Sequence, residues 1–221
     1  MSSKRILITA GPTHEKIDPV RFIGNYSSGK MGFALAQTCA EHGMEVTLIA
    51  GPVQLQIEHP NIQRIDVTSA VEMYEAALTH FPTQDAAILC AAVADYRPEQ
   101  MHSQKIKRTG DDLVIRLVPN PDIAARLGQM AQPRQVMVGF ALETDNEETH
   151  ALGKMERKNL DMIVLNSLRD AGAGFQGETN KITLLYRNGT IEPYPLKLKT
   201  AVAEDIVVAL EQLLKEKSEK I

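Results

Sequence analysis

The sequence predicts an α/β protein with a Rossmann-like, doubly wound and mostly parallel sheet, helices on both faces, and β-hairpin excursions. Strand-like apolar runs alternate with segments of helical periodicity along most of the chain, which is typical of β-α-β units. The 221 residues are 43% hydrophobic, enough to bury one sizeable core. The dipeptide Asn188-Gly189 is a strong signal for a tight hairpin turn.

The first series of elements has strands at residues 5–9, 46–50, 63–67 and 86–92, and helices at 29–42 and 69–80. The second has helices at 121–130 and 146–158, strands at 136–141 and 161–165, and a last helix at 200–216. Parallel strands covered on both faces are nearly continuous apolar runs, and these strands fit that pattern. Ligands of such sheets bind beyond the carboxyl ends of the strands.

Two hairpins interrupt the alternation. One pairs residues 105–108 with 113–118 around Thr-Gly-Asp-Asp, and the other pairs 182–186 with 190–194 around Arg187-Asn-Gly189. Neither is easily placed in a parallel sheet. We therefore expect excursions that cover a site, as a flap, or that pair with another subunit.

Composition and charge exclude several classes of function. The net charge of -4 argues against nucleic acid or an anionic membrane surface as the main partner. The chain has no run of about 18 apolar residues, and its start leads into a strand rather than a signal peptide, so a cytoplasmic protein is expected. Cys39 and Cys90 are expected to be small buried residues, and no metal-ligand spacing of Cys or His appears.

Residues 25–32, NYSSGKMG, place an amide, two hydroxyls and two glycines where a helix begins after a buried strand. The unpaired N–H groups of a helix start carry partial positive charge, and Gly29 and Gly32 allow close approach to the backbone. Ser27 or Ser28 is expected to cap the helix. This corner predicts phosphate binding.

Two short patterns in this corner point to other families. Gly24 to Lys30 satisfies part of a P-loop, but Met31 stands where a hydroxyl must hold magnesium. Tyr26 and Lys30 have the spacing of a short-chain dehydrogenase pair, but that pair belongs far down the chain, and the glycine fingerprint after the first strand is missing. Both interpretations are therefore disfavoured, and Lys30 is expected to be a helix-surface lysine.

Taken with its approach, residues 8–32, ITAGPTHEKIDPVRFIGNYSSGKMG, closely resemble the phosphopantothenoylcysteine synthetase family of coenzyme A biosynthesis. Further motifs occur in the family's order and spacing: AAVADYR at 91–97, KIKR at 105–108, NPDI at 120–123, VGFA at 138–141 and KNLD at 158–161. The departures are modest: His14, Gly24, Tyr26 and Arg108 replace residues common in the family. The resemblance covers essentially the whole chain and implies a single synthetase domain over residues 1–221.

The resemblance implies a homodimeric ligase that joins 4'-phosphopantothenate to cysteine, with CTP as co-substrate in most bacteria and Mg²⁺ as cofactor. In many bacteria this synthetase is fused behind a flavin-dependent decarboxylase. Only the synthetase part is recognised here, so no flavin is expected in this chain, and a separate phosphopantothenoylcysteine decarboxylase is a possible partner. The carboxylate first displaces pyrophosphate to form an acyl-cytidylate, and the cysteine amine then displaces CMP.

By the same resemblance, Asn25 and Lys105 are the catalytic candidates, and Arg21, Asn25 and Ala92 bind the acid substrate. The nucleotide-binding candidates are Gly11, Ser27, Gly29, Gly32, Leu89, Cys90, Ala91, Asp95, Lys105, Pro121, Asp122, Ile123, Ala124, Phe140, Lys154 and Lys158. Magnesium ligands are not identified.

Several alternatives stay open at this stage. Lys154 and Lys158 lie four residues apart and share a helix face, but spacing alone also fits a solvated basic edge. Asp95 fits a nucleotide contact, a helix cap or a magnesium ligand, and Asn25 fits a cap or a turn residue. No side-chain pattern distinguishes CTP from ATP. Two rivals from other classes are an NAD(P)-dependent reductase and a non-catalytic nucleotide sensor.

Overall fold

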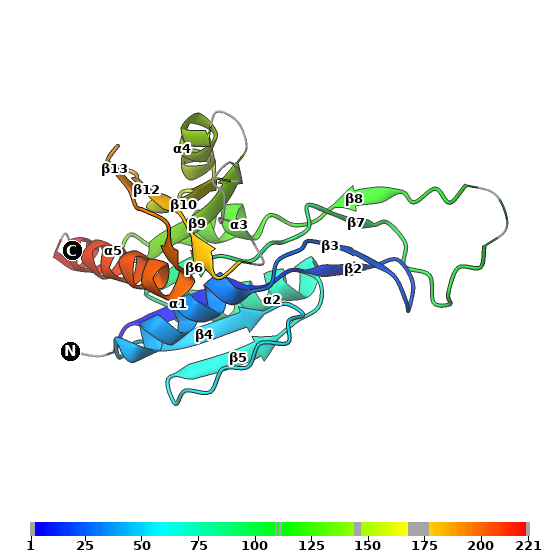
Figure 1. Cartoon of the computed structure of the whole chain (residues 1–221), viewed down its shortest axis with the longest axis horizontal. Coiled ribbons are helices and arrows are strands. Elements are labelled where there is room, and N and C mark those ends of the chain that lie inside the picture. The colour runs from blue at the N-terminus through cyan, green and yellow to red at the C-terminus, as the bar shows by residue number, and fades with distance from the viewer. Residues whose placement is uncertain (1–2, 109, 111, 144–146, 168–176, 220–221) are drawn as a thin grey trace.

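The computed structural model describes residues 3–108, 110, 112–143, 147–167 and 177–219. Within them lies an eight-stranded sheet (Figure 1). Its strands are β1 (Arg5–Ala10), β4 (Glu45–Ala50), β5 (Ile62–Asp66), β6 (Ala86–Leu89), β9 (Val136–Glu143), β10 (Met162–Ser167), β12 (Ile182–Tyr186) and β13 (Ile191–Pro193). Their spatial order is β13-β12-β10-β9-β6-β1-β4-β5. The strands from β10 to β5 run parallel, whereas β12 and β13 are added antiparallel.

Five α-helices of the described residues cover the sheet: α1 (Lys30–Glu41), α2 (Ala70–His80), α3 (Ile123–Met130), α4 (Glu147–Arg157) and α5 (Lys199–Glu219). A short 3-10 helix (Phe81–Thr83) follows α2. Helices α1 and α5 pack on one face, and α2, α3 and α4 on the other (Figure 1). The predicted doubly wound α/β fold is confirmed.

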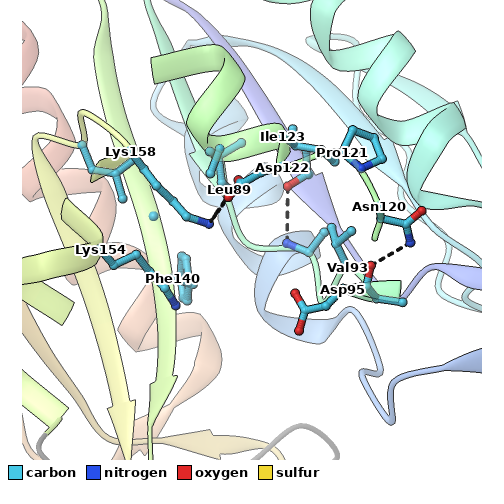
Figure 2. A pocket seen from close by; sticks show the side chains of 16 residues that line it. Leu89, Val93, Asp95, Asn120, Pro121, Asp122, Ile123, Phe140, Lys154 and Lys158 are labelled. Atoms are coloured by element: carbon cyan, nitrogen blue, oxygen red, sulfur yellow. Dashed lines mark hydrogen bonds and ion pairs between the residues drawn. The ribbon is translucent and has the colours of Figure 1, made fainter. Parts of the chain in front are cut away.

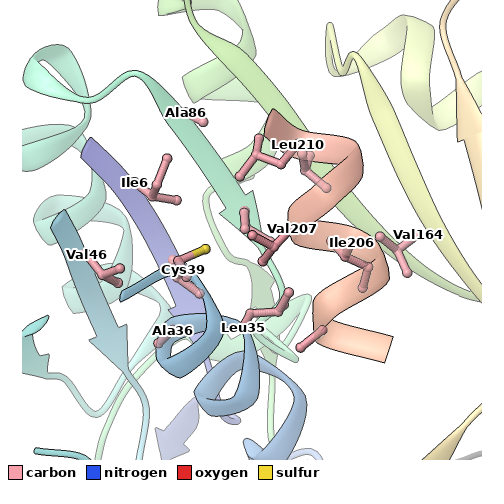
Figure 3. Packing of buried hydrophobic residues seen from close by; sticks show 14 of the residues in the cluster. Ile6, Leu35, Ala36, Cys39, Val46, Ala86, Val164, Ile206, Val207 and Leu210 are labelled. Atoms are coloured by element: carbon pink, nitrogen blue, oxygen red, sulfur yellow. The ribbon is translucent and has the colours of Figure 1, made fainter. Parts of the chain in front are cut away.

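Strand β1 shows how the sequence builds these layers. Ile6 and Ile8 belong to the core under α1 and α5, while Leu7 between them belongs to the core under α2, α3 and α4. All three are fully buried. Figure 3 shows side chains from α1 and α5, among them Cys39 and Val207, gathered over Ile6. Successive side chains of a strand point to opposite faces of the sheet, so one apolar strand contributes to the cores on both faces.

The hairpin predicted at 182–194 is confirmed as β12 and β13, but its expected position was wrong. It extends the main sheet, because β12 pairs antiparallel with β10. An antiparallel edge can be added to a parallel sheet without a crossover helix. The predicted hairpin is therefore part of the fold rather than an excursion from it.

The hairpin predicted at 105–118 is not formed. Instead β8 (Leu117–Pro119) pairs with β7 (Tyr96–Pro98), and the described residues of 99–116 lie outside strands. The side chains of Leu113 and Val114 are 52% and 89% exposed, so no buried face fixes a strand register here. Strand β6 also ends at Leu89, before the predicted 92.

A long arm projects from the sheet (Figure 1). It consists of β7, β8, the segment between them, and a ladder of β2 (His14–Lys16) with β3 (Phe22–Gly24) that lies beside β7. A further short ladder joins β11 (Thr179–Asn180) to β14 (Lys197–Leu198). In the part of the chain that the structure describes, no helix is long and apolar enough to cross a membrane.

Candidate functional site

A cavity of about 320 Å³ opens at the carboxyl ends of β1, β6 and β9, beside the start of α3. We call it the α3 cavity (Figure 2). It brings together many residues that the sequence predicted for the nucleotide: Leu89, Ala91, Asp95, Pro121, Asp122, Ile123, Ala124, Phe140, Lys154 and Lys158. They come from four separate stretches of chain, and the strand order brings them to one edge. The location agrees with the rule for ligand sites in doubly wound sheets.

The start of α3 is held by Asp122, whose carboxylate accepts a hydrogen bond from the Ala125 N–H at 2.9 Å. The Lys158 ammonium lies 2.9 Å from the same carboxylate (Figure 2). Burial raises the pKa of Asp122, but the hydrogen bonds from Ala125 and Lys158 outweigh it, so the net shift is downward. A positive side chain therefore stands at a helix N-terminus, where an anion is favoured.

Lys154 on α4 and Lys158, the residue that follows the end of α4, line the α3 cavity, and both are half-buried. The helix ends one residue before Lys158, but both side chains still line the same cavity. On the opposite side, the exposed Asp95 lines the cavity near Asn120, whose amide donates to the Ala94 carbonyl at 2.8 Å (Figure 2). The cavity combines the two lysines with the exposed carboxylates of Asp95 and Asp122, a set that can bind phosphates together with a divalent ion.

A second cavity of about 160 Å³ lies at the start of α1, and we call it the α1 cavity. It shares Ala91 and Phe140 with the α3 cavity, so the two adjoin. Ser27, Gly29, Gly32, Cys90 and Ala92 of the predicted site line it. The phosphate corner predicted from the sequence and the lysines at 154 and 158 thus line two adjoining cavities.

The predicted serine cap of α1 is wrong. Gly29 is the N-cap, with φ of 78° and no side-chain cap bond, and Ser27 Oγ instead accepts from the Gly29 N–H at 3.3 Å. The left-handed conformation favours glycine at this position. Gly32 is required for a different reason, because a Cβ there would lie 2.5 Å from the Ala10 Cβ. These glycines let the first turn of α1 pack tightly against the end of β1.

Asn25 lies at the edge of the α1 cavity. Its side-chain N–H donates to the Ala92 carbonyl at 2.9 Å, and Ala92 lines the cavity. Gly11 lies behind this contact, because its carbonyl accepts from the Ala92 N–H at 2.9 Å. The two predicted acyl-binding residues Asn25 and Ala92 are therefore in direct contact.

Arg21 and Lys105 lie elsewhere. Both line a third cavity of about 720 Å³ on the arm, together with Ile106, Lys107, Arg108, Asp112 and Leu113. Arg21 is ion-paired with Asp18, and its guanidinium also donates to the Ile106 carbonyl at 3.0 Å. Lys105 is exposed. In this conformation the structure does not bring the Lys105 side chain to the α1 or α3 cavity, so its role stays a prediction.

Sequence reasoning missed several residues that line these cavities, namely Thr9, Asn120, Asn166, Asn180 and Lys199. Asn120 and Asn166 carried a usable signal, because a polar side chain that follows an apolar strand or starts a helix motif lies at the carboxyl edge of the sheet. Asn180 and Lys199 carried none. The β11–β14 ladder brings them in from the end of the chain.

The two cysteines are poor candidates for nucleophiles, because a thiol of high pKa is rarely ionised at neutral pH. Both are free, and burial raises the pKa of each thiol to about 12. The prediction of a small buried residue is confirmed for Cys39, whereas Cys90 is only half-buried and lines the α1 cavity. The described residues also hold no group of three or more His, Cys, Asp or Glu side chains placed to bind a metal.

Comparisons with known proteins show the family of this chain. The family model of the DNA/pantothenate metabolism flavoprotein C-terminal domain matches residues 1–214. The chain belongs to this family. A solved member, the C-terminal domain of the coenzyme A biosynthesis bifunctional protein CoaBC, has 40% identity and a TM-score of 0.83 over 98% of each chain. The resemblance read from the sequence motifs is confirmed.

Curated relatives of this flavoprotein C-terminal family are longer. A cysteine/cysteine sulfinic acid decarboxylase from an unknown prokaryotic organism is 55% identical over 207 residues, 94% of this chain and 58% of its own length. The CoaBC protein of Vibrio parahaemolyticus is 47% identical over 216 residues, 97% of this chain and 54% of its own. The chain thus spans little more than half of these relatives, and the activities in their names do not transfer automatically.

Proposed function

We propose that the chain is a phosphopantothenate–cysteine ligase of coenzyme A biosynthesis that uses CTP through an acyl-cytidylate intermediate. The observation that carries this proposal is the pair of adjoining cavities, one with Lys154 and Lys158, the other at the α1 corner beside Asn25. Two connected sites suit a reaction in which a nucleotide and an acid must meet. Family membership supports the same assignment.

In the first step, a carboxylate oxygen of phosphopantothenate attacks the α-phosphorus of CTP. A new P–O bond forms, and the bond to pyrophosphate breaks. Negative charge accumulates on the phosphates, so fixed cations and N–H donors lower the barrier. We assign this work to Lys154, Lys158 and the N-terminus of α3, with Lys105 expected to add charge if the arm brings it in.

In the second step, the cysteine amine attacks the activated carbonyl. The C–N bond forms, the C–O bond to CMP breaks, and the amine proton is released to water. The carbonyl oxygen becomes an oxyanion, and the Asn25 amide is the proposed donor that stabilises it. An amide suits this task because it donates without adding a competing charge.

Magnesium fits this site through Asp95. Mg²⁺ is usually held by one or two carboxylates together with substrate phosphates and water, and Asp95 supplies an exposed carboxylate on the α3 cavity. When bound, the ion would neutralise charge on the triphosphate. No flavin role is proposed for this chain.

A homodimer is part of the proposal. The arm exposes several large apolar side chains, including Val20 at 61%, Phe22 at 51%, Tyr96 at 54% and Met101 at 60%. Exposed apolar side chains that gather on one projecting element suit an interface with a second copy. The proposed compartment is the cytoplasm, and a phosphopantothenoylcysteine decarboxylase is the proposed consumer of the product.

One assay tests the function. The protein is incubated with CTP, Mg²⁺ and phosphopantothenate, with and without cysteine, and pyrophosphate, CMP and the coupled thiol are measured. The proposal expects all three products with cysteine, and ATP and UTP arms decide the nucleotide. Triphosphate binding without pyrophosphate release would identify a sensor instead, and NADPH oxidation followed near 340 nm would identify a reductase.

A further inference from the structure

We propose that Arg187 and Asn159 are positioning residues for the nucleotide, because they fix the stretch of backbone that carries Lys158. Arg187 follows β12, in the turn of the β12–β13 hairpin, and Asn159 is the residue after Lys158. Neither of the two lines the α1 or the α3 cavity. The inference rests on the proposed function and deepens it, because it explains how residues outside the α3 cavity set the place of a lysine within it.

Helix α4 ends in a tight turn around Asn159. The φ of Asn159 is 50°, a left-handed conformation that asparagine adopts more readily than most residues. The Leu160 N–H donates to the Met155 carbonyl at 2.9 Å, and the Asn159 N–H donates to the Glu156 carbonyl at 3.2 Å. These two bonds form a Schellman motif, in which Lys158 is the C-cap of α4. The conformation of Asn159 therefore sets the direction of the chain at Lys158.

The Asn159 side chain joins this turn to α3 and to the hairpin. Its side-chain N–H donates to the Gly128 carbonyl at 2.8 Å, and its Oδ1 accepts from the Arg187 guanidinium at 2.8 Å. Gly128 lies so close to the turn that a Cβ there would be 1.9 Å from the Lys158 carbonyl oxygen. The backbone of Lys158 is thus packed directly against α3, the helix whose start lines the α3 cavity.

Arg187 fixes the same turn from the hairpin. Its guanidinium donates to the Leu160 carbonyl through Nε at 2.9 Å and through a terminal nitrogen at 2.7 Å, in addition to its bond to Asn159. The Arg187 N–H donates to the Asp161 carbonyl at 3.0 Å. A guanidinium carries five donors in one plane, so a single side chain can hold two acceptors in a fixed geometry. The two residues after Lys158 are therefore both held by Arg187.

Lys158 is held at its backbone and at its ammonium. The backbone packs on Gly128, in the last turn of α3, and the ammonium lies 2.9 Å from the carboxylate of Asp122, the N-cap of the same helix (Figure 2). A lysine side chain has many rotamers, so the place of its charge depends on where its backbone is fixed. A site is weakened when the supporting residues leave a contact about 1 Å too loose. Loss of the bonds from Arg187 and Asn159 should therefore weaken the contact of Lys158 with phosphates.

Kinetics distinguish this positioning role from a purely structural one. Arg187→Gln removes the charge and the paired donors, whereas Asn159→Gly keeps the left-handed turn and removes both side-chain bonds. In each variant we expect the KM for CTP to rise about fivefold, as for the loss of one hydrogen bond, and the KM for cysteine to stay unchanged. A variant that only unfolds more readily has less active enzyme, which lowers kcat and leaves the KM for CTP as it is in the wild type.

Tyr186→Phe is the matched control. It removes the hydrogen bond from the Tyr186 hydroxyl to the Glu192 carboxylate at 3.0 Å, in the same hairpin, and leaves the Arg187 side chain in place. Steady-state formation of CMP gives kcat and KM for every protein, and thermal melting measures the stability of each. The control should have the wild-type KM for CTP. An equal rise in the control, or an unchanged KM for CTP in both test variants, would overturn the inference.

A double-mutant cycle shows whether Arg187 acts through Lys158. When Lys158→Gln is already present, Arg187→Gln should raise the KM for CTP less than about twofold, because the lysine that it positions is gone. Equal fold-changes with and without Lys158 would mean that Arg187 acts by another route, and the inference would be wrong.

Failure of the proposed function would look different. The wild type would then release no pyrophosphate from CTP with phosphopantothenate. Calorimetric titration with CTP and Mg²⁺ would still decide the present inference. Binding that is about fivefold weaker in Arg187→Gln but unchanged in Tyr186→Phe supports the positioning role. Equal binding to all three proteins, or none to the wild type, rejects it.

Discussion

Asp18 holds the backbone of Ile106, because its carboxylate accepts a hydrogen bond from the Ile106 N–H at 3.1 Å. The same carboxylate pairs with Arg21, which in turn donates to the Ile106 carbonyl at 3.0 Å. Asp18 is 1% exposed, and its hydrogen bond to Arg21 holds its pKa well below the ordinary range. The residue next to Lys105 is thus fixed on both sides of its backbone by one ion pair.

Asp18→Asn is expected to loosen this segment. The neutral amide accepts more weakly, so hydrogen exchange at the Ile106 amide should become faster. If Lys105 acts on the phosphates, kcat falls while the KM for CTP changes little. Asp66→Asn, at an exposed ion pair with Arg64, serves as the control. Unchanged exchange at Ile106 would show that Asp18 does not restrain the segment.

Lys158→Gln is expected to weaken the binding of CTP. Loss of a charge-assisted contact to phosphate should raise the KM for CTP roughly tenfold or more. Arg157→Gln removes an exposed charge next to it and should have little effect. Steady-state pyrophosphate release measures both variants. Equal effects of the two substitutions would indicate general electrostatics rather than a specific contact.

Asn25→Asp is expected to separate the two half-reactions. Acyl-cytidylate should still form, but its use should slow about 100-fold, because a carboxylate repels the oxyanion that the amide would stabilise. Single-turnover quenching shows whether the intermediate accumulates. Equal loss of both steps contradicts this division of labour.

His42 makes folding stability depend on pH. Its ring contacts Glu211 at 3.1 Å and Glu204 at 3.0 Å, and these contacts raise its pKa from 6.5, Glu211 giving the largest effect. Because the pKa of His42 is higher in the folded than in the unfolded protein, its charged ring contributes fully to the unfolding free energy below about pH 6.5. This contribution is lost as the pH rises through the pKa of the folded state. The contribution should be about 1 kcal/mol or less, since the contact is partly exposed.

Chemical denaturation of the wild type and of His42→Gln measures this effect. The difference in unfolding free energy between the two proteins should be largest near pH 5.5 to 6 and should shrink toward about pH 8.5. A difference that is constant across this range would mean that the ring contributes only packing between α1 and α5.

Val20→Lys tests the proposed dimer. A charge placed in an apolar interface must lose its hydration, which costs free energy. The dissociation constant of the dimer should therefore rise about tenfold or more. Val208→Lys, on α5, is the control because the two valines have similar exposure, 61% and 52%. Sedimentation measures both. A fully active wild-type monomer would exclude the dimer.

Patterning along the chain was enough to predict the doubly wound class, most strands and helices, and the corner at residues 25–32. These features depend on near neighbours: alternation within a strand, periodicity within a helix, and glycines at a turn. The motifs also assigned the family, because they reflect chemistry kept at fixed positions. Gly29, for example, is the N-cap of α1 close to where the pattern places a helix start.

The arrangement of the site depends on contacts between distant residues. The hairpin at 182–194 belongs to the main sheet because β12 pairs with β10. The hairpin predicted at 105–118 does not form, and β8 pairs with β7 instead. The β11–β14 ladder brought Asn180 and Lys199 to the α1 cavity. No local pattern encodes these pairings, because their energy comes from surfaces that meet only when the chain has folded, and those surfaces decide which side chains face the ligand.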